Sequence, residues 1–142
     1  MAVVALCPCA AEAKLPTKPE DVLPYLEQVY KNGDIDAYAN LLAGDYRFVM
    51  EDMGVTWDTA GELKGTRKLF ERTSAQLSFS GDISVTPASR AGTWVIDDVV
   101  GNLQVTQKSD GKVFRVQNTY SFVIRDEKGT LRIVEWRQKL SR

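Results

Sequence analysis

The sequence predicts an α+β domain in which three N-terminal helices pack on a strongly curved antiparallel sheet. Two observations lead to this prediction. Apolar residues recur at helical spacing in the first half of the chain, and alternating segments joined by glycine turns fill the second half. Helices that precede a run of hairpin-linked strands are typical of α+β architecture rather than of a parallel sheet. The 142 residues suffice for one such domain.

Three segments have the spacing of amphipathic helices, at residues 19–32, 34–42 and 63–77. Proline is tolerated in the first turn of a helix, so Pro19 marks the start of the first segment. Gly33 is placed to end it, since glycine readily adopts the left-handed conformation of a helix cap. Asp34 is placed to cap the second helix.

Five segments read as strands, at residues 46–50, 79–86, 93–107, 113–125 and 131–140. Asp110-Gly111 and Lys128-Gly129 between the later segments are typical of hairpin turns. The strands over 93–107 and 113–125 are longer than most, and such strands bend around a helix, often at a glycine such as Gly101.

Alternation along the strand over 113–125 predicts one buried face and one wetter face. The predicted inner face comprises Phe114, Val116, Asn118, Tyr120, Phe122 and Ile124, and the outer face Arg115, Gln117, Thr119, Ser121 and Arg125. The last strand places Val134, Trp136 and Leu140 on one side and Ile133, Glu135 and Arg137 on the other. We expect Leu26, Val29, Leu41, Leu69, Val116 and Phe122 to be buried.

Composition excludes several classes of function. The chain has no histidine, which removes the commonest metal ligand and every Ser-His-Asp or Cys-His mechanism. Its two cysteines, Cys7 and Cys9, are too few for structural zinc, so we expect no metal and no cofactor. No helix or strand is expected to gather the basic residues into a stripe, so we expect no nucleic-acid partner. No apolar run is long enough for a transmembrane segment.

Residues 1–18 differ in composition from residues 19–142, which we expect to form the domain. Ala11-Glu12-Ala13 has the A-x-A form of a signal-peptidase site, but no basic segment precedes the short apolar run. Residues 1–18 are therefore either a flexible tail or the remnant of an export signal. A cytoplasmic location and an exported one, periplasmic or secreted, both stay open.

Several motifs together resemble the nuclear transport factor 2-like superfamily, which includes ketosteroid isomerases and SnoaL-like cyclases. The stretch from Leu26 to Tyr38 matches the family's helix, Gly-Asp, helix opening, and Leu41 to Tyr46 matches its step from a leucine-rich turn into a strand. Leu63 to Phe70 matches its third helix, and the hairpin from Asp126 to Trp136 its last two strands. The resemblance implies a cone-shaped roll whose curved sheet encloses a cavity.

The resemblance also suggests catalytic residues. In ketosteroid isomerases a Glu-Asp pair after the first strand supplies the general base, which suggests Glu51 and Asp52 here. The pair lies about two residues later than in the isomerases, and Met53 follows where proline is usual. Asn118 aligns approximately with their protonated aspartate, and an amide there could donate to a ligand oxygen. Their tyrosine donor has no counterpart, because Leu26 takes the matching place.

Aromatic residues at element spacing are mostly expected in the core, and some of them in the cavity. We expect a mainly apolar pocket for a hydrophobic small molecule, lined by Tyr46, Trp57, Phe70, Asn118, Tyr120 and Trp136. The reaction, if there is one, cannot be assigned from the sequence. Three possibilities stay open: a binding domain, an isomerase, lyase or hydrolase that uses a carboxylate, and a protein-interaction module. The resemblance further implies a homodimer through the outer face of the sheet.

Overall fold

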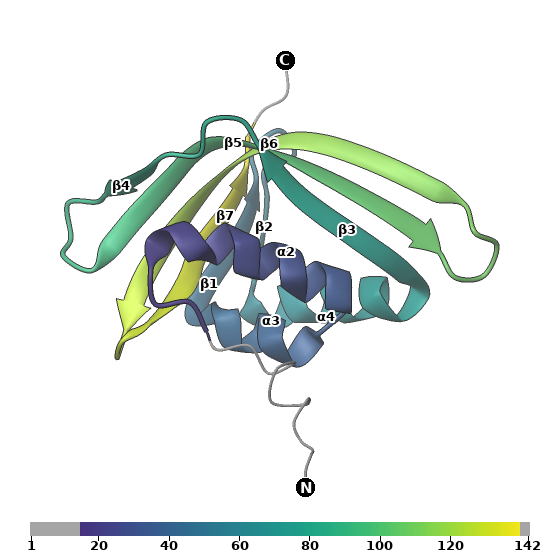
Figure 1. Ribbon diagram of the computed structural model, residues 1–142, viewed down its shortest axis with the longest axis horizontal. Helices are drawn as coiled ribbons and strands as arrows, with labels where there is room; N and C mark the ends of the chain where they lie inside the picture. Colours follow the sequence, from purple (N-terminus) through teal and green to yellow (C-terminus); the bar gives the residue numbers. More distant parts are fainter. Residues whose placement is uncertain (1–14, 140–142) are drawn as a thin grey trace, which may run out of the picture.

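The computed structural model describes residues 15–139 and contains three α-helices on one side of a curved sheet (Figure 1). A short 3-10 turn, η2 (Pro19–Asp21), precedes α2 (Val22–Asn32), α3 (Ile35–Leu41) and α4 (Thr59–Arg72). The strands are β1 (Leu42–Met50), β2 (Val55–Asp58), β3 (Thr73–Ser80), β4 (Val85–Pro87), β5 (Thr93–Gln107), β6 (Val113–Glu127) and β7 (Thr130–Gln138). The predicted α+β architecture is confirmed.

The sheet has the order β2-β1-β7-β6-β5-β3, with β4 paired to β5. All pairs are antiparallel except β1 with β7, so the sheet is mixed rather than purely antiparallel as predicted. The exception arises because the first and last strands of the roll lie side by side and run in the same direction. The helices cover the concave face of this sheet, as Figure 1 shows.

Local signals account for the helix ends. Gly33 ends α2 with φ 61°, the left-handed conformation that glycine adopts without strain. The side chain of Asp34 accepts a hydrogen bond from the Ala37 backbone amide at the start of α3, as predicted. Asp58 caps α4 in the same way through the Gly61 amide.

The third helix differs from its predicted span of 63–77. It begins four residues earlier, at Thr59, because Asp58 supplies the cap. It ends at Arg72, and the following strand β3 starts at Thr73. The segment after Arg72 alternates, with Ala75 and Leu77 buried and Ser74, Gln76 and Ser78 exposed, which is the period of a strand.

Two β-bulges decide which side chains point inward. In β7 the register shifts at Val134, so that Ile133 and Trp136 are both buried. In β5 it shifts at Asp97-Asp98, so that Ile96 and Val99 are both buried. The predicted placement of Ile133 on the outer face is therefore wrong, because the extra residue in β7 changes the alternation.

The hydrophobic core lies between the helices and the concave face. Of the residues expected to be buried, Leu26, Val29, Leu41 and Phe122 are buried, and Leu69 is half-buried. Val116 is 47% exposed, so that prediction is wrong. Val116 lies in the distal part of the β5–β6 hairpin, residues 101–118. This part of the hairpin extends past the helices in Figure 1, so no helix covers Val116.

The predicted tail over residues 1–18 lies mostly outside the described residues. Of the part that is described, Pro16 is buried, and its carbonyl accepts a hydrogen bond from the Leu131 amide at 3.0 Å. No helix in the described part of the chain has the length and apolar character needed to cross a membrane.

Candidate functional site

The carboxyl group of Glu62 lies inside the molecule, and only 6% of this residue is exposed. The hydroxyl of Tyr38 donates a hydrogen bond to its Oε2 at 2.5 Å. The indole N–H of Trp57 donates to its Oε1 at 2.7 Å. The hydroxyl of Thr66, one helical turn further along α4, donates to Oε2 at 3.4 Å. Side chains from α3, β2 and α4 thus fix both carboxyl oxygens.

The start of α4 determines this arrangement. Glu62, Thr66 and Phe70 are spaced by four residues and share the buried face of the helix. A Cβ at Gly61 would lie only 3.2 Å from Cβ of Trp57. The glycine therefore allows Trp57 to fold over the first turn of α4 and reach the carboxyl group.

Burial raises the pKa of Glu62 above that of an exposed glutamate, because a charged carboxylate loses its hydration in the interior. The hydrogen bonds from Tyr38, Trp57 and Thr66 act in the opposite direction and offset part of this effect. Burial also raises the pKa values of Tyr38 and Tyr46, and the charge of nearby Glu62 adds to the increase. Glu62 is thus the group in this cluster whose proton is most readily exchanged.

Aromatic rings from several elements surround this cluster. Phe48 stacks on Trp57 with ring centroids 4.9 Å apart, and Trp136 lies 5.6 Å from Phe48. Tyr120 meets Trp136 edge to face at 5.5 Å. On the helix side Tyr30 packs against Phe70 at 5.2 Å and against Trp136 at 6.4 Å. The interior near Glu62 is therefore apolar, with a few polar groups.

One polar atom in this region makes no hydrogen bond with the described residues. It is Nε1 of Trp136, on β7, a residue with an exposed fraction of 4%. The hydroxyl of Tyr46, on β1, is also buried, but its interaction with the Tyr38 side chain lowers the Tyr46 pKa and offsets part of the effect of burial. An unpaired buried donor costs about 1–3 kcal/mol, so most buried donors in proteins have a partner.

The structure brings the predicted aromatic residues together. Trp57, Phe70, Tyr120 and Trp136 all pack in the cluster around Glu62 and Tyr30. Tyr46 is buried in the same core. Asn118 is half-buried at its edge, and its amide donates to the Tyr120 hydroxyl at 3.4 Å.

The two predicted carboxylates lie elsewhere. Asp52 is exposed in the turn between β1 and β2. Glu51 is half-buried and pairs with Arg137, with Oε2 and Nη1 3.3 Å apart. Arg137 belongs to a series of ion pairs that continues through Glu135 to Arg47.

Sequence reasoning missed Glu62 because its predicted third helix began at Leu63. The signal was nevertheless present. Counting back from the buried positions Phe70 and Thr66 in steps of four places an acidic residue on the apolar face.

No protein-family profile matches the sequence, and no curated protein matches it. Solved structures do match its fold. A conserved protein from Planctomyces limnophilus has a TM-score of 0.73 at 13% identity, over 83% of this chain and 89% of that one. An NTF2-like protein of unknown function in nutrient uptake from Rhodospirillum rubrum has a TM-score of 0.68 at 20% identity, over 84% and 94%.

A nuclear transport factor 2-like superfamily protein from Salmonella enterica serovar Typhimurium matches with a TM-score of 0.67 at 10% identity, over 82% of this chain and 83% of that one. Identities this low are informative about fold alone. The three helices on a curved sheet agree with the superfamily resemblance noted in the sequence, and so do these structural matches. The chain has the nuclear transport factor 2-like fold.

Proposed function

We propose that this domain binds a small, largely apolar organic molecule that carries an oxygen acceptor, in the interior between α4 and the concave face of the sheet. The observation that carries the proposal is a buried donor without a partner among the described residues, Trp136 Nε1. A carbonyl or ether oxygen would accept a hydrogen bond from it and remove the energetic cost of its burial. The surrounding rings would contact the apolar part of the ligand.

Glu62 adds a hydrogen-bond acceptor to the same region. Its oxygens already accept three hydrogen bonds, and its raised pKa means that it can hold or release a proton in the interior. A ligand with both a carbonyl and a hydroxyl group would therefore find a donor and an acceptor. If the ligand is transformed, Glu62 is better placed than the exposed Asp52 to move its proton.

The test uses a matched pair of probes, 2-acetonaphthone and 2-ethylnaphthalene, which differ mainly in the carbonyl group. Binding is followed by fluorescence of Trp57 and Trp136 in a Trp94→Phe background, since the chain has three tryptophans. We expect the ketone to bind about tenfold more tightly than the hydrocarbon, because one hydrogen bond in a dry site is equivalent to about 1.4 kcal/mol.

Trp136→Phe should remove this preference for the ketone, because it removes the indole N–H and keeps an aromatic ring. Binding to this variant is followed by the fluorescence of Trp57. Tyr25→Phe, on the partly exposed side of α2, is the control and should leave both probes unaffected. Equal affinity for the two probes, or an unchanged preference in Trp136→Phe, would contradict the proposal.

We also propose that the protein forms a homodimer through the outer face of the sheet. Thr119, Val100 and Val123 lie on this face and are half-buried within one chain. Its polar residues already pair with one another, as Arg115 does with Gln104 and Gln117 with Asn102. A face whose polar groups are satisfied can meet a second copy without leaving donors unpaired.

A further inference from the structure

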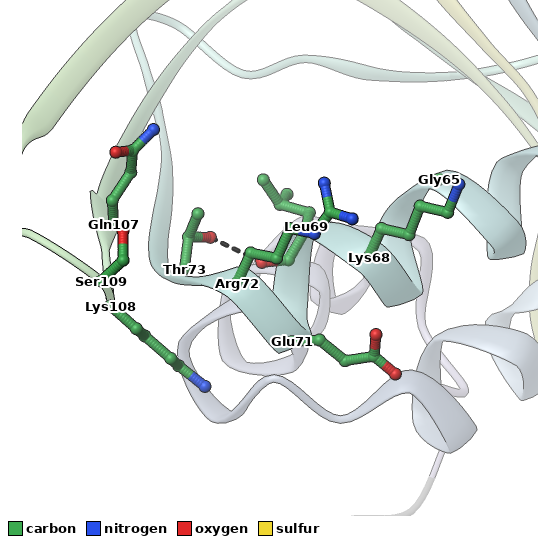
Figure 2. Close-up of a pocket in the computed structure, with 9 residues that line it drawn as sticks. All are labelled: Gly65, Lys68, Leu69, Glu71, Arg72, Thr73, Gln107, Lys108 and Ser109. Atoms are coloured by element: carbon green, nitrogen blue, oxygen red, sulfur yellow. Dashed lines mark hydrogen bonds between the residues drawn. The ribbon is translucent and has the colours of Figure 1, made fainter.

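A hollow lies outside the aromatic cluster, between α4 and the tip of the β5–β6 hairpin (Figure 2). Its volume is about 780 Å³, within the range of small-molecule sites. One wall is a single face of α4, formed by residues at positions i, i+3, i+4 and i+7: Gly65, Lys68, Leu69 and Arg72. Gln107, Lys108 and Ser109 form the opposite wall.

Positive charge predominates in this hollow. Lys68, Arg72 and Lys108 line it, against the single carboxylate of Glu71. Figure 2 shows the ends of Lys68 and Arg72 on one side of α4 and the Glu71 carboxylate directed away from them. Contrary to the sequence-based expectation, α4 carries a basic stripe, because Lys64, Lys68 and Arg72 are four residues apart.

Some cations in the described part of the chain are already paired. Arg125, Arg137 and Lys139 all pair with carboxylates. The side chains of Lys68 and Arg72, by contrast, make no hydrogen bond or ion pair with a residue in the range 15–139. Their donors are therefore available to a ligand.

The negative end of the α4 dipole does not oppose an anion here, because its last carbonyl groups have partners. The Thr73 hydroxyl donates to the Leu69 carbonyl at 2.7 Å. Lys108 donates twice, from its amine to the Phe70 carbonyl at 3.2 Å and from its backbone amide to the Arg72 carbonyl at 2.9 Å. Hydrogen bonding and the Lys108 charge offset the partial negative charge of the helix end.

The same wall also contains two uncharged residues. A Cβ at Gly65 would meet no atom within 4 Å, so the absence of a side chain there leaves the hollow wide. Leu69 is half-buried and packs on the hydrophobic core while also lining the hollow. One helix face thus places an apolar surface beside two unpaired cations.

We infer that this hollow binds a small amphiphilic organic anion. Its acid group would lie between Lys68 and Arg72, where a guanidinium can bind a carboxylate through two hydrogen bonds. Its apolar part would lie along Gly65 and Leu69. This site is separate from the aromatic cluster around Glu62 and takes a ligand of different charge.

The experiment compares octanoate, 1-octanol and inorganic phosphate by calorimetry and by amide NMR at one fixed ionic strength. We expect octanoate to bind more tightly than either of the others, with the largest shifts at residues 65–73 and 107–109. Lys68→Gln/Arg72→Gln should weaken octanoate about five- to tenfold, the effect of losing two exposed charge contacts. Binding of 1-octanol should not change.

Gly65→Leu provides a test of shape, since a Cβ at Gly65 meets no atom within 4 Å and the longer side chain would extend into the hollow. It should abolish octanoate binding and leave the melting temperature unchanged or raised, because leucine is a better helix former than glycine. Arg67→Gln, on α4 but outside the hollow, is the matched control and should bind octanoate normally. The inference would be overturned if Gly65→Leu bound octanoate with full affinity, or if Arg67→Gln weakened octanoate as much as the double variant does. It would also be overturned if phosphate bound as tightly as octanoate, or if the unmodified protein did not bind octanoate.

Discussion

At the scale of single residues, Glu62 is the most unusual position in the domain. A buried carboxyl group destabilises a fold unless hydrogen bonds compensate for lost hydration, and Glu62 accepts bonds from Tyr38, Trp57 and Thr66. Its pKa is still raised, so burial outweighs these bonds. The folded state therefore holds the Glu62 proton more strongly than the unfolded chain does.

This difference makes stability depend on pH. Between the pKa of an unfolded glutamate, about 4.3, and the raised pKa of folded Glu62, the folded state binds more protons than the unfolded state. The contribution of Glu62 to the free energy of unfolding is therefore largest below that window and falls as pH rises through it. The slope is at most about 1.4 kcal/mol per pH unit for one proton.

Urea unfolding of the unmodified protein and of Glu62→Gln, measured across this pH range, tests the assignment. As pH rises, the free energy of unfolding of the unmodified protein should fall relative to that of Glu62→Gln, because glutamine carries no titrating proton. Curves that run parallel at every pH would show that Glu62 titrates as an ordinary exposed glutamate.

At the scale of elements, the long strands depend on a few irregular positions. Asp98 has φ 56° in the β5 bulge, and Lys139 pairs with it and with Asp97. Gly101 lies three residues further along β5, where the ring of Tyr120 crosses the backbone. A Cβ at Gly101 would lie 2.4 Å from Cε2 of Tyr120. The glycine therefore places this ring against the sheet and beside Trp136.

Gly101→Ala should consequently destabilise the protein by about 1–3 kcal/mol, the usual effect of overpacking a core. Gly44→Ala is the matched control, since a Cβ at Gly44 meets nothing within 4 Å and its backbone is not left-handed. Thermal and urea unfolding of both variants provide the comparison. Equal stability of the two would mean that Tyr120 moves aside at no energetic cost.

At the scale of the whole molecule, the proposed homodimer would form through the outer face of the sheet. This face is polar, and Ile133, once expected on it, is buried in the core. A stable dimer needs roughly 1,200–2,000 Å² of buried surface, which only a broad contact across several strands can provide. Assembly through this face should therefore be of moderate affinity.

Sedimentation at micromolar concentration should show a species near twice 15.8 kDa. Thr119→Glu, in the middle of the outer face, should shift it to the monomer by placing like charges across the two-fold axis. Thr56→Glu on the exposed edge strand β2 should leave the dimer intact. A monomer that persists at about 100 μM, far above the dissociation constant of a specific dimer, would refute the assembly.

From the sequence alone follow the α+β class, the three helices, the strands β1, β5, β6 and β7, and most of the aromatic cluster. The strands β2 and β4 were not predicted, and the strand predicted over 79–86 lies at Thr73–Ser80. Tyr120 and Phe70 could be predicted because strand and helical periods follow from neighbours only a few residues away. Trp57 lay outside the predicted helices and strands, and the structure places it in β2. Caps at Gly33 and Asp34 are local in the same way.

The tertiary structure alone decided which faces are covered and which groups meet. Periodicity cannot locate the bulges that direct Ile133 and Trp136 to the same side, since these depend on pairing with β6. It cannot show that no helix covers Val116, or that Tyr38 and Trp57 converge on Glu62. Each of these features results from contacts between segments distant in sequence, and the energy of such contacts depends on the whole fold rather than on local residue preference.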